Sequence, residues 1–342
     1  MNVCLTPRER GLSFKEIQVS RTGADARTVS MDFIVVPGFS MMALSSVLEP
    51  IQRANAEAGR KIISWRLRSW DGQAVSCSSG MSVPVDGPVR SEEAPDFTFV
   101  CASRKPETNL PARLPDYIRG LWRRGRVVGG ICGGTYALAK AGILAGRRFT
   151  LHWEHHPVFR ARWPDLDPSN EVYCIDGRIV TCAGGAAAAD MALELINACC
   201  GEKAVFAAME QCLIGTKRSE TAEQTPCIAA RLGTRNENLL RAIEWIEDNF
   251  QTESGIGNLY DAVGVSPRQI QRLFRDHVGL SPLKYMKERR LRHARALLAE
   301  TDMSVVQIAA LCCYETTTYF SADFRRRYGV SPHQFSMLER RT

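Results

Sequence analysis

The sequence lacks an apolar run long enough to cross a bilayer. No stretch of about 18 residues is free of charges, and the most apolar region, Thr181–Cys200, is interrupted by Asp190 and Glu194. Residues 1–30 contain neither an apolar core nor a small-residue cleavage site, so a secretory signal is not expected. We therefore expect a cytoplasmic protein with no membrane partner, whose residues 1–30 form a flexible tail.

Cysteines at metal-ligand spacing are also missing. The 342-residue chain has 12 Cys and 6 His, yet no C-x-x-C pair or Cys/His array with zinc spacing occurs. Most of the cysteines lie inside expected strands and helices, among them Cys101, Cys174 and Cys312. Without a secretory signal, reduced and buried cysteine is the favoured interpretation, and we expect neither a metal site nor a cofactor.

A strong excess of one charge is absent too. The net charge is +7, which is too mild to identify a nucleic-acid partner by itself. The distribution is more informative, because nine Lys and Arg residues but only two acidic residues lie between Arg268 and Arg295. The hydrophobic fraction of 45% excludes disorder for most of the chain. The length predicts two domains.

Residues 31–214 alternate short apolar runs with amphipathic segments, which predicts an α/β domain with a largely parallel sheet. Expected strands cover residues 31–37, 62–69, 97–101 and 126–131, and Asp176-Gly177 predicts a hairpin. Expected helices cover residues 41–58, 112–124, 135–141, 186–199 and 203–213. Residues 215–235 lose this periodicity and contain Pro226, so we assign them to a linker.

Residues 236–342 are expected to form an all-α domain that contains an internal repeat. LFRDHVGLSP, residues 273–282, and DFRRRYGVSP, residues 323–332, share Phe, Arg, Gly, Ser and Pro in register. The simplest architecture is two helix-turn-helix motifs joined by a long helix, residues 282–299.

The first motif has strong local signals for a DNA-reading helix. Gly264 permits a turn, Ser266 is a good N-cap and Pro267 suits the first helical position. Arg and Gln side chains can make bidentate contacts with guanine and adenine in the major groove, although a solvated helix face is the plain alternative. The outward positions are Arg268, Gln271, Arg272 and Arg275.

The second motif has an expected helix at residues 316–328, with Phe320 and Phe324 facing inward. Its outward chemistry discriminates bases less well, because Thr and Ser contact bases and phosphates alike. Arg289 and Arg290, on the connecting helix, are interpreted as phosphate contacts or solvated charges. The outward positions of the second motif are Thr317, Thr318, Ser321, Ala322, Arg325 and Arg326.

The segment from VGVSPRQIQRLFRDHVGLSP to DFRRRYGVSPHQF resembles the DNA-binding domain of AraC-type transcriptional regulators. The resemblance implies a double-stranded DNA operator, a homodimer and, for an activator, RNA polymerase as partners. This sequence departs from the family pattern at Cys313, where a turn glycine is usual, and at Tyr260, Tyr314 and Ala322. These departures predict a second motif that binds less specifically.

In the first domain, VVGGICGGTYALAKAG places Cys132 in a tight turn between a strand and a helix. This nucleophile-elbow pattern sets the sulfur at a helix N-terminus, where the pKa of a thiol falls. His152 follows twenty residues later. The combination resembles the flavodoxin-like fold of the PfpI and class I glutamine-amidotransferase-like proteins. Together with the AraC-type domain, it resembles regulators of the GlxA type.

Catalysis is not expected from this elbow. In the enzymes that it resembles, a carboxylate of the first helix supports the cysteine, whereas alignment places Ala43 there, and Glu49 is nearly two turns away. Gly133 stands where the proteases have a histidine. We therefore assign no catalytic residue. A cysteine hydrolase fused to a DNA-binding tail and a thiol redox sensor stay open as alternatives.

The remaining interpretation is a ligand pocket at the carboxyl ends of the strands. Backbone N–H groups of residues 37–41 and 132–135 suit a carboxylate, and aromatic rings suit a cationic nitrogen. The resemblance implies an activator of a catabolic operon that senses a nitrogenous metabolite, such as arginine, glycine betaine or carnitine. The candidate ligand-binding residues are Phe39, Ser40, Cys132, Gly133, His152 and Trp153.

Overall fold

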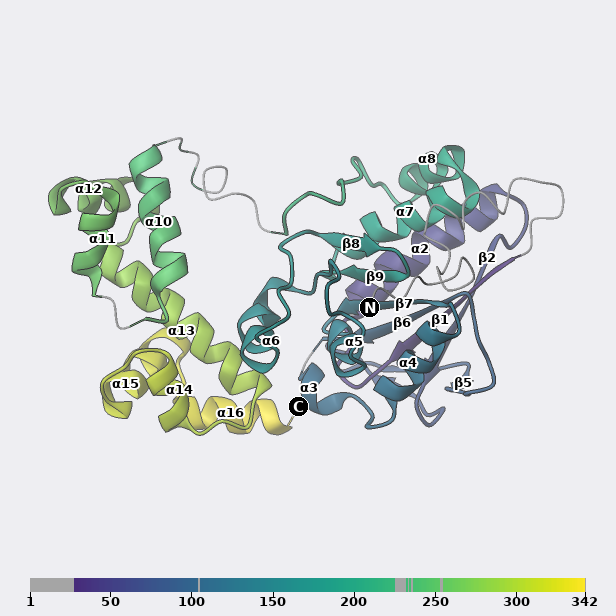
Figure 1. Cartoon of the computed structure of the whole chain (residues 1–342), viewed down its shortest axis with the longest axis horizontal. Helices are drawn as coiled ribbons and strands as arrows, with labels where there is room; N and C mark the ends of the chain where they lie inside the picture. Colours follow the sequence, from purple (N-terminus) through teal and green to yellow (C-terminus); the bar gives the residue numbers. More distant parts are fainter. Residues whose placement is uncertain are drawn as a thin grey trace, which may run out of the picture. The chain divides into compact units, whose positions relative to one another are not determined.

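The computed structural model describes residues 28–103, 105–224, 232, 234, 236–252 and 255–341. It divides into two compact units, residues 1–224 and 225–342 (Figure 1). Among the described helices, none is long and apolar enough to cross a membrane. The ten cysteines that lie in the described part of the chain are all free, as expected for reduced thiols.

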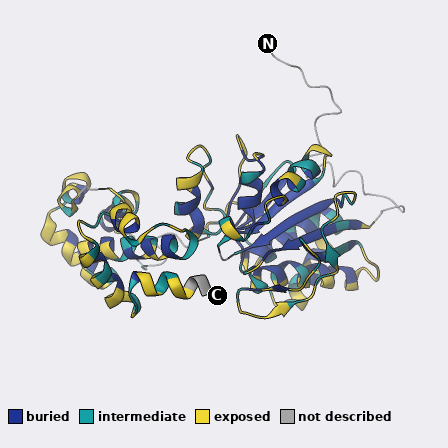
Figure 2. Cartoon of the chain, turned by 90° about the horizontal axis from the view of Figure 1, so that it is seen from below, coloured by how far each residue is buried: buried dark blue, intermediate teal, exposed yellow. Residues whose placement is uncertain are grey.

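The first unit is built on a seven-stranded sheet. Its order is β5-β2-β1-β6-β7-β9-β8, and the strand pairs are parallel except β8 with β9. The inner strands are buried on both faces, as Figure 2 shows in dark blue, which explains their unbroken apolar sequence. The strands are β1 (Val29–Val35), β2 (Ile63–Ser69), β5 (Gly87–Pro88), β6 (Phe97–Ala102), β7 (Val127–Cys132), β8 (Tyr173–Asp176) and β9 (Ile179–Cys182).

Helices cover both faces of this sheet (Figure 1). On one face, α2 (Met41–Glu57), α7 (Ala187–Cys200) and α8 (Glu202–Gln211) pack together in one apolar core. On the other face, α4 (Leu114–Arg123), α5 (Thr135–Lys140) and α6 (His156–Arg162) contribute to a second core. The smaller elements are β3 (Val75–Ser76), β4 (Ser82–Val83), α3 (Pro106–Asn109) and the 3₁₀-helix η1 (Trp153–His155). The predicted α/β fold is confirmed.

The boundaries of the tail and the linker differ from our expectation. Strand β1 begins at Val29, inside the expected tail, whose first 27 residues lie outside the described part. Residues 215–224, expected to be linker, belong to the first unit. There the Val172 N–H donates to Ala222 O at 2.8 Å, and the Gln224 N–H donates to Asn170 O at 2.9 Å. These bonds extend along edge strand β8, a long-range pairing that local composition does not reveal.

The second unit is helical throughout its described residues, as predicted. In the first motif, α11 (Ile256–Val263) and α12 (Pro267–Val278) pack against α10 (Glu237–Asn249). In the second motif, α14 (Val305–Leu311) packs against α15 (Thr317–Tyr328). Helix α16 (Pro332–Arg341), which the sequence did not lead us to expect, packs against α15 and α13. Helix α13 (Pro282–Glu300) joins the two motifs.

Local sequence explains where these helices begin. Ser266 Oγ accepts a hydrogen bond from the Gln269 N–H and Thr316 Oγ1 accepts one from the Tyr319 N–H, so each second helix of a motif has a side-chain N-cap. Ser304 and Gln307 form a capping box at the start of α14. Phe274 in α12 and Phe324 in α15, fifty residues apart, are both fully buried.

Candidate DNA-reading helices and effector site

Helix α12 has a clear division between its two faces. Ile270, Leu273 and Phe274 are buried in the core of the first motif. The four side chains predicted to face outward are all exposed: Arg268, Gln271, Arg272 and Arg275. Arg275 pairs with Asp276 of its own helix at 3.4 Å, while both side chains stay more than half exposed. The helix therefore offers four long polar groups to a partner.

Helix α15 offers a different surface at the equivalent positions. Thr318 and Arg325 are exposed as predicted, but Thr317 and Ser321 are only half-exposed, so they are less available than we expected. Tyr319 is 69% exposed and was missed by our sequence analysis. Helical phase places it one residue before the buried Phe320, a position that the sequence analysis did not assign to either face.

Our interpretation of two arginines in α13 is wrong. Arg289 is only 21% exposed, pairs with Glu247 at 2.5 Å, and lies over the Phe250 ring. The Arg290 guanidinium donates to Phe250 O, Thr252 O and Cys313 O, at 2.7, 3.0 and 3.3 Å. These two side chains are thus occupied by the protein itself. Arg290 connects the end of α10 to the turn of the second motif.

In the first unit, the turn after β7 places Cys132 in the left-handed region, with φ of 57°. Neighbouring glycines allow this close packing. A Cβ added at Gly184 would lie 2.7 Å from Cys132 Cβ, and one at Gly134 would collide with Val100 O at 1.8 Å. The predicted elbow is therefore present, and its side chain is buried.

The histidine nearest the cysteine is His155, not the His152 that we selected. Cys132 Sγ lies 3.9 Å from His155 Nε2 and 3.8 Å from Ser103 Oγ. His152 instead caps η1, where its Nδ1 accepts from the Glu154 N–H, and its ring stacks on Trp153. Burial is the main cause that lowers the pKa of His152, and the neighbouring His155 lowers it further. The ring is therefore neutral at pH 7.

His156, the third histidine of this segment, has a structural position. Its Nε2 lies 3.0 Å from Leu151 O, and burial lowers the pKa of the ring to about 4. Three histidines within five residues thus have three different environments. Sequence spacing alone could not identify the one that reaches Cys132, because the 3₁₀ turn of η1 sets their directions.

Two of the predicted ligand contacts are already used by the fold. Phe39 is fully buried in the core between the sheet and α2, so it offers no aromatic surface. Ser40 Oγ accepts from the Ala43 N–H as the N-cap of α2. Trp153, at 36% exposure, is the candidate aromatic side chain that solvent can reach.

The predicted cradle of backbone N–H groups is not free either. Phe39 N–H donates to Val36 O at 3.0 Å, and Gly133 N–H donates to Ala102 O at 2.9 Å. The neighbouring Gly38 and Gly134 N–H groups are likewise bonded to backbone carbonyls. A carboxylate would therefore have to displace existing hydrogen bonds at these positions.

The positions that differ from the enzymes are closed in the structure. Ala43 is 1% exposed within α2, and Glu49 is exposed and pairs with Arg53 at 3.5 Å. A side chain at Gly133 would begin 2.8 Å from Pro106 Cβ, because the start of α3 occupies that space. Neither the helical carboxylate nor the histidine of the enzymes has a substitute at these places.

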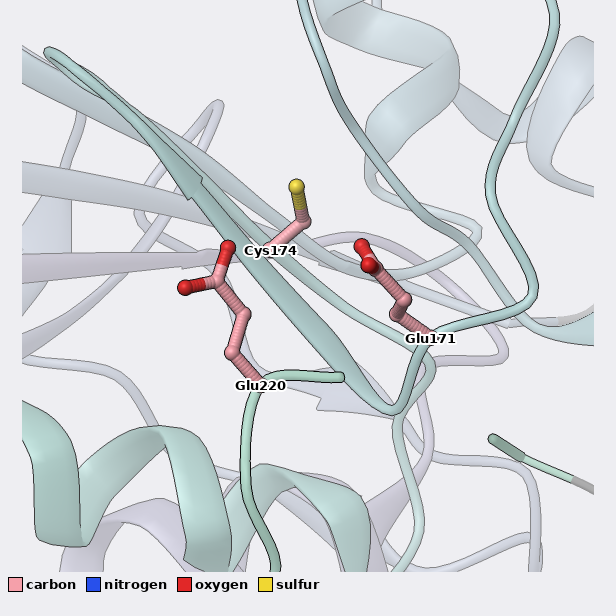
Figure 3. A group of neighbouring side chains, drawn as sticks. All are labelled: Glu171, Cys174 and Glu220. Carbon is pink, nitrogen blue, oxygen red and sulfur yellow. The ribbon is translucent and has the colours of Figure 1, made fainter. Parts of the chain in front are cut away.

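Glu171, Cys174 and Glu220 form a cluster at the edge of the sheet, shown in Figure 3. Their candidate ligand atoms lie within 4.8 Å of one another. However, Arg148 Nη2 donates to Glu171 at 3.0 Å and to Glu220 at 3.1 Å, so a guanidinium already occupies the space between the two carboxylates and offsets one of their two charges. Burial raises the pKa of the Cys174 thiol to about 12, which disfavours a thiolate ligand. We interpret the cluster as structural.

Comparison with known proteins agrees with this division into two parts. Residues 31–198 match the DJ-1/PfpI family, and residues 259–337 match a helix-turn-helix domain. The chain is 36% identical to the HTH-type transcriptional regulator CdhR of Pseudomonas aeruginosa, over 88% of this chain and 90% of that protein. It is 33% identical to the HTH-type transcriptional regulator GlxA of Rhizobium meliloti, over 90% and 96%.

Solved structures support the fold of the first unit. A protein from Vibrio parahaemolyticus is 18% identical and superposes with a TM-score of 0.50, over 54% of this chain and 99% of that chain. The two motifs, the α/β unit with its cysteine elbow and the full-length relatives together identify the family. The chain belongs to the AraC-family helix-turn-helix transcriptional regulators that carry a DJ-1/PfpI-type N-terminal domain.

Proposed function

We propose that this regulator recognises its operator chiefly through α12. The observation that carries this proposal is the row of exposed side chains Arg268, Gln271, Arg272 and Arg275 on a helix whose other face is locked in a core. Such side chains make the bidentate contacts that distinguish guanine and adenine. Helix α15, with Thr318 and Arg325 exposed, contributes phosphate contacts and weaker discrimination.

Selection of bound sites from a random DNA pool, followed by electrophoretic mobility shift at a stated salt concentration, tests this role. A single enriched sequence is the expected result. Enrichment of no sequence would contradict operator recognition. From the resemblance to AraC-type regulators we also infer a homodimer on a repeated operator, in which each protomer brings two motifs to its half-site. The same resemblance supports a cytoplasmic activator of a catabolic operon that contacts RNA polymerase.

The first unit is proposed to sense a small nitrogenous metabolite without turning it over. Trp153 and His152 provide an aromatic, uncharged surface beside His155, the histidine that approaches Cys132, and this surface suits an amino acid or a quaternary ammonium compound. A thermal-shift screen with arginine, glycine betaine and carnitine tests this. A bound effector at a hundred times its Kd adds about 2.7 kcal/mol to stability. A shift that disappears in Trp153→Ala supports the site, and no shift with any probe opposes this effector class.

A second candidate function has one observation in its favour, the 3.9 Å approach of Cys132 Sγ to His155 Nε2. Such a pair can support thiol chemistry, as a hydrolase or as a redox sensor. Turnover that differs between the wild type and Cys132→Ala would support the hydrolase. Selective modification of Cys132 by mild peroxide, followed by mass spectrometry, would support the sensor. We favour the inactive sensor because Ala43 and Gly133 offer neither supporting group.

We also infer that the two units fold separately and are joined after Gln224. Limited proteolysis should therefore cut within residues 225–235 before it cuts elsewhere, and it should release two stable fragments. First cleavage within residues 215–224 would contradict the packing of that segment on the first unit.

A further inference from the structure

Gln224 is the last residue of the first unit. Its side chain hydrogen-bonds to the loop that carries the proposed effector site. Its Nε2 lies 2.9 Å from both Thr150 Oγ1 and Leu151 O, and 3.1 Å from Glu171 O. Its Oε1 accepts from the Trp153 N–H at 2.8 Å. One amide therefore joins the segment that leads to Trp153 with the segment that enters β8.

This amide also continues into the cysteine elbow. Thr135, the first residue of α5, donates from Oγ1 to Thr150 O at 3.0 Å. Thr135, Thr150 and Gln224 thus belong to one hydrogen-bonded path, and Thr135 lies three residues after Cys132 in the sequence. Trp153 joins the same path through its backbone N–H, which donates to Gln224 Oε1, and not through its ring.

We define the exit segment as residues 217–224. It is held on the first unit at several points besides Gln224. The Arg218 side chain pairs with the buried Asp190 at 2.7 Å, and Lys217 pairs with Glu194. Glu220 Oε1 accepts from the Ile175 N–H at 3.1 Å, and Figure 3 shows Glu220 and Glu171 on either side of the strand that carries Cys174. Gln224 is the residue of the exit segment that hydrogen-bonds to the loop carrying His152 and Trp153.

We propose that Gln224 is a positioning residue of the effector site and couples its occupancy to the exit segment. The proposal rests on the proposed effector site. A ligand that moves the Leu151–Trp153 backbone must stretch or strengthen the Gln224 bonds, because these bonds hold that backbone. Coupling is reciprocal, so the exit segment in turn biases the site. The occupant to which this coupling responds is of the amino-acid or quaternary ammonium class.

Amide hydrogen–deuterium exchange on the full chain, without any ligand, tests the coupling directly. Gln224→Leu removes all four hydrogen bonds, so exchange at the Trp153 amide should accelerate at least tenfold. Gln224→Glu keeps an acceptor for that amide but loses the donor, so the Trp153 amide should stay within threefold of wild type. Exchange at the backbone amides of Val172 and of residue 224 should nevertheless accelerate. Thr221→Ala, in the same exposed segment, is the matched control and should change neither region.

The reverse experiment starts from the site. Trp153→Pro removes the N–H that donates to Gln224 Oε1, at the first position of η1, and should accelerate exchange at Val172 and at residue 224. Trp153→Ala keeps that N–H and should not. If Gln224→Leu fails to fold, the contrast between Gln224→Glu and Thr221→Ala decides the question. Unchanged exchange at Val172 and residue 224 in both Gln224→Glu and Trp153→Pro would overturn the coupling. Because no ligand is used, a negative thermal-shift screen would refute the effector class and leave this result standing.

Discussion

Helices α12 and α15 occupy equivalent places in the two motifs, fifty residues apart in the sequence. On the inside, Ile270 and Phe274 correspond to Phe320 and Phe324, and all four are fully buried. On the outside, Arg268, Gln271 and Arg272 correspond to Thr318, Ser321 and Ala322. The packed faces are both apolar, whereas the outer face of α15 has short side chains at three of the four positions and a long polar group only at Arg325. The comparison indicates that the same fold can carry one reading helix and one weakly discriminating helix.

The two motifs also depend on each other. The Arg290 guanidinium bonds carbonyl groups at the end of α10 and in the turn before α15, so it belongs to both motifs. Helices α12 and α15 are therefore parts of one packed set of helices, although their exposed faces differ. Because of this dependence, we expect the largest effect on stability from removal of the Arg290 side chain.

Arg290→Ala should destabilise the second unit by about 2–3 kcal/mol, because it leaves three carbonyl groups without their charged donor. Hydrogen–deuterium exchange of the second-unit amides in the full chain, followed through a urea titration, measures this change. Arg292→Ala removes a charge from the exposed side of the same helix and should cost less than about 0.5 kcal/mol. Equal effects of the two substitutions would show that Arg290 does not join the motifs.

Arg272→Ala should cost about 1–3 kcal/mol of operator binding and relax the preference at one base pair. Its counterpart is already an alanine, Ala322, so the variant makes the outer face of α12 resemble that of α15. Titration of the selected operator and of unrelated DNA at one salt concentration provides the measurement. An equal loss of affinity for both DNAs would contradict the role of α12 and would assign sequence specificity to Thr318 and its neighbours.

Arg325→Ala should weaken all DNA sequences by a similar factor, because a phosphate contact carries no sequence information. The slope of log K against log salt should become shallower by about 1. Arg275 stands at the equivalent position of α12 and is proposed to contact a base, so Arg275→Ala should instead relax the preference at one base pair. A change in base preference with an unchanged salt slope would contradict this role for Arg325.

Local signals allowed much of the fold to be predicted from the sequence. Ser266, Pro267 and Gly264 fix the start of α12 within a few residues, and short apolar runs mark the buried strands. Features that depend on distant partners were missed. Arg290 looked like a surface charge because helical phase does not show which neighbour covers it. Gln224 looked like part of a linker, since its partners lie more than fifty residues away in the sequence.

The smallest expected effect concerns the turns of the two motifs. Gly264 ends α11 with φ of 69°, and Cys313, at the corresponding turn, has φ of 55°. A residue with a Cβ is strained in this region by about 1–2 kcal/mol, which glycine avoids, although glycine also gains entropy in the unfolded chain. Cys313→Gly should therefore raise the free energy of unfolding by about 0.5–1 kcal/mol, measured by urea denaturation.

The reverse substitution gives the matching test. A Cβ added at Gly264 meets nothing within 4 Å, so Gly264→Ala changes backbone strain without introducing a clash. It should lower the free energy of unfolding by about 1 kcal/mol. Changes of opposite sign at Gly264 and Cys313 would assign the difference between the two turns to φ alone. A loss of stability in Cys313→Gly would instead mean that the half-buried Cys313 side chain stabilises its turn by packing more than its backbone strain destabilises it.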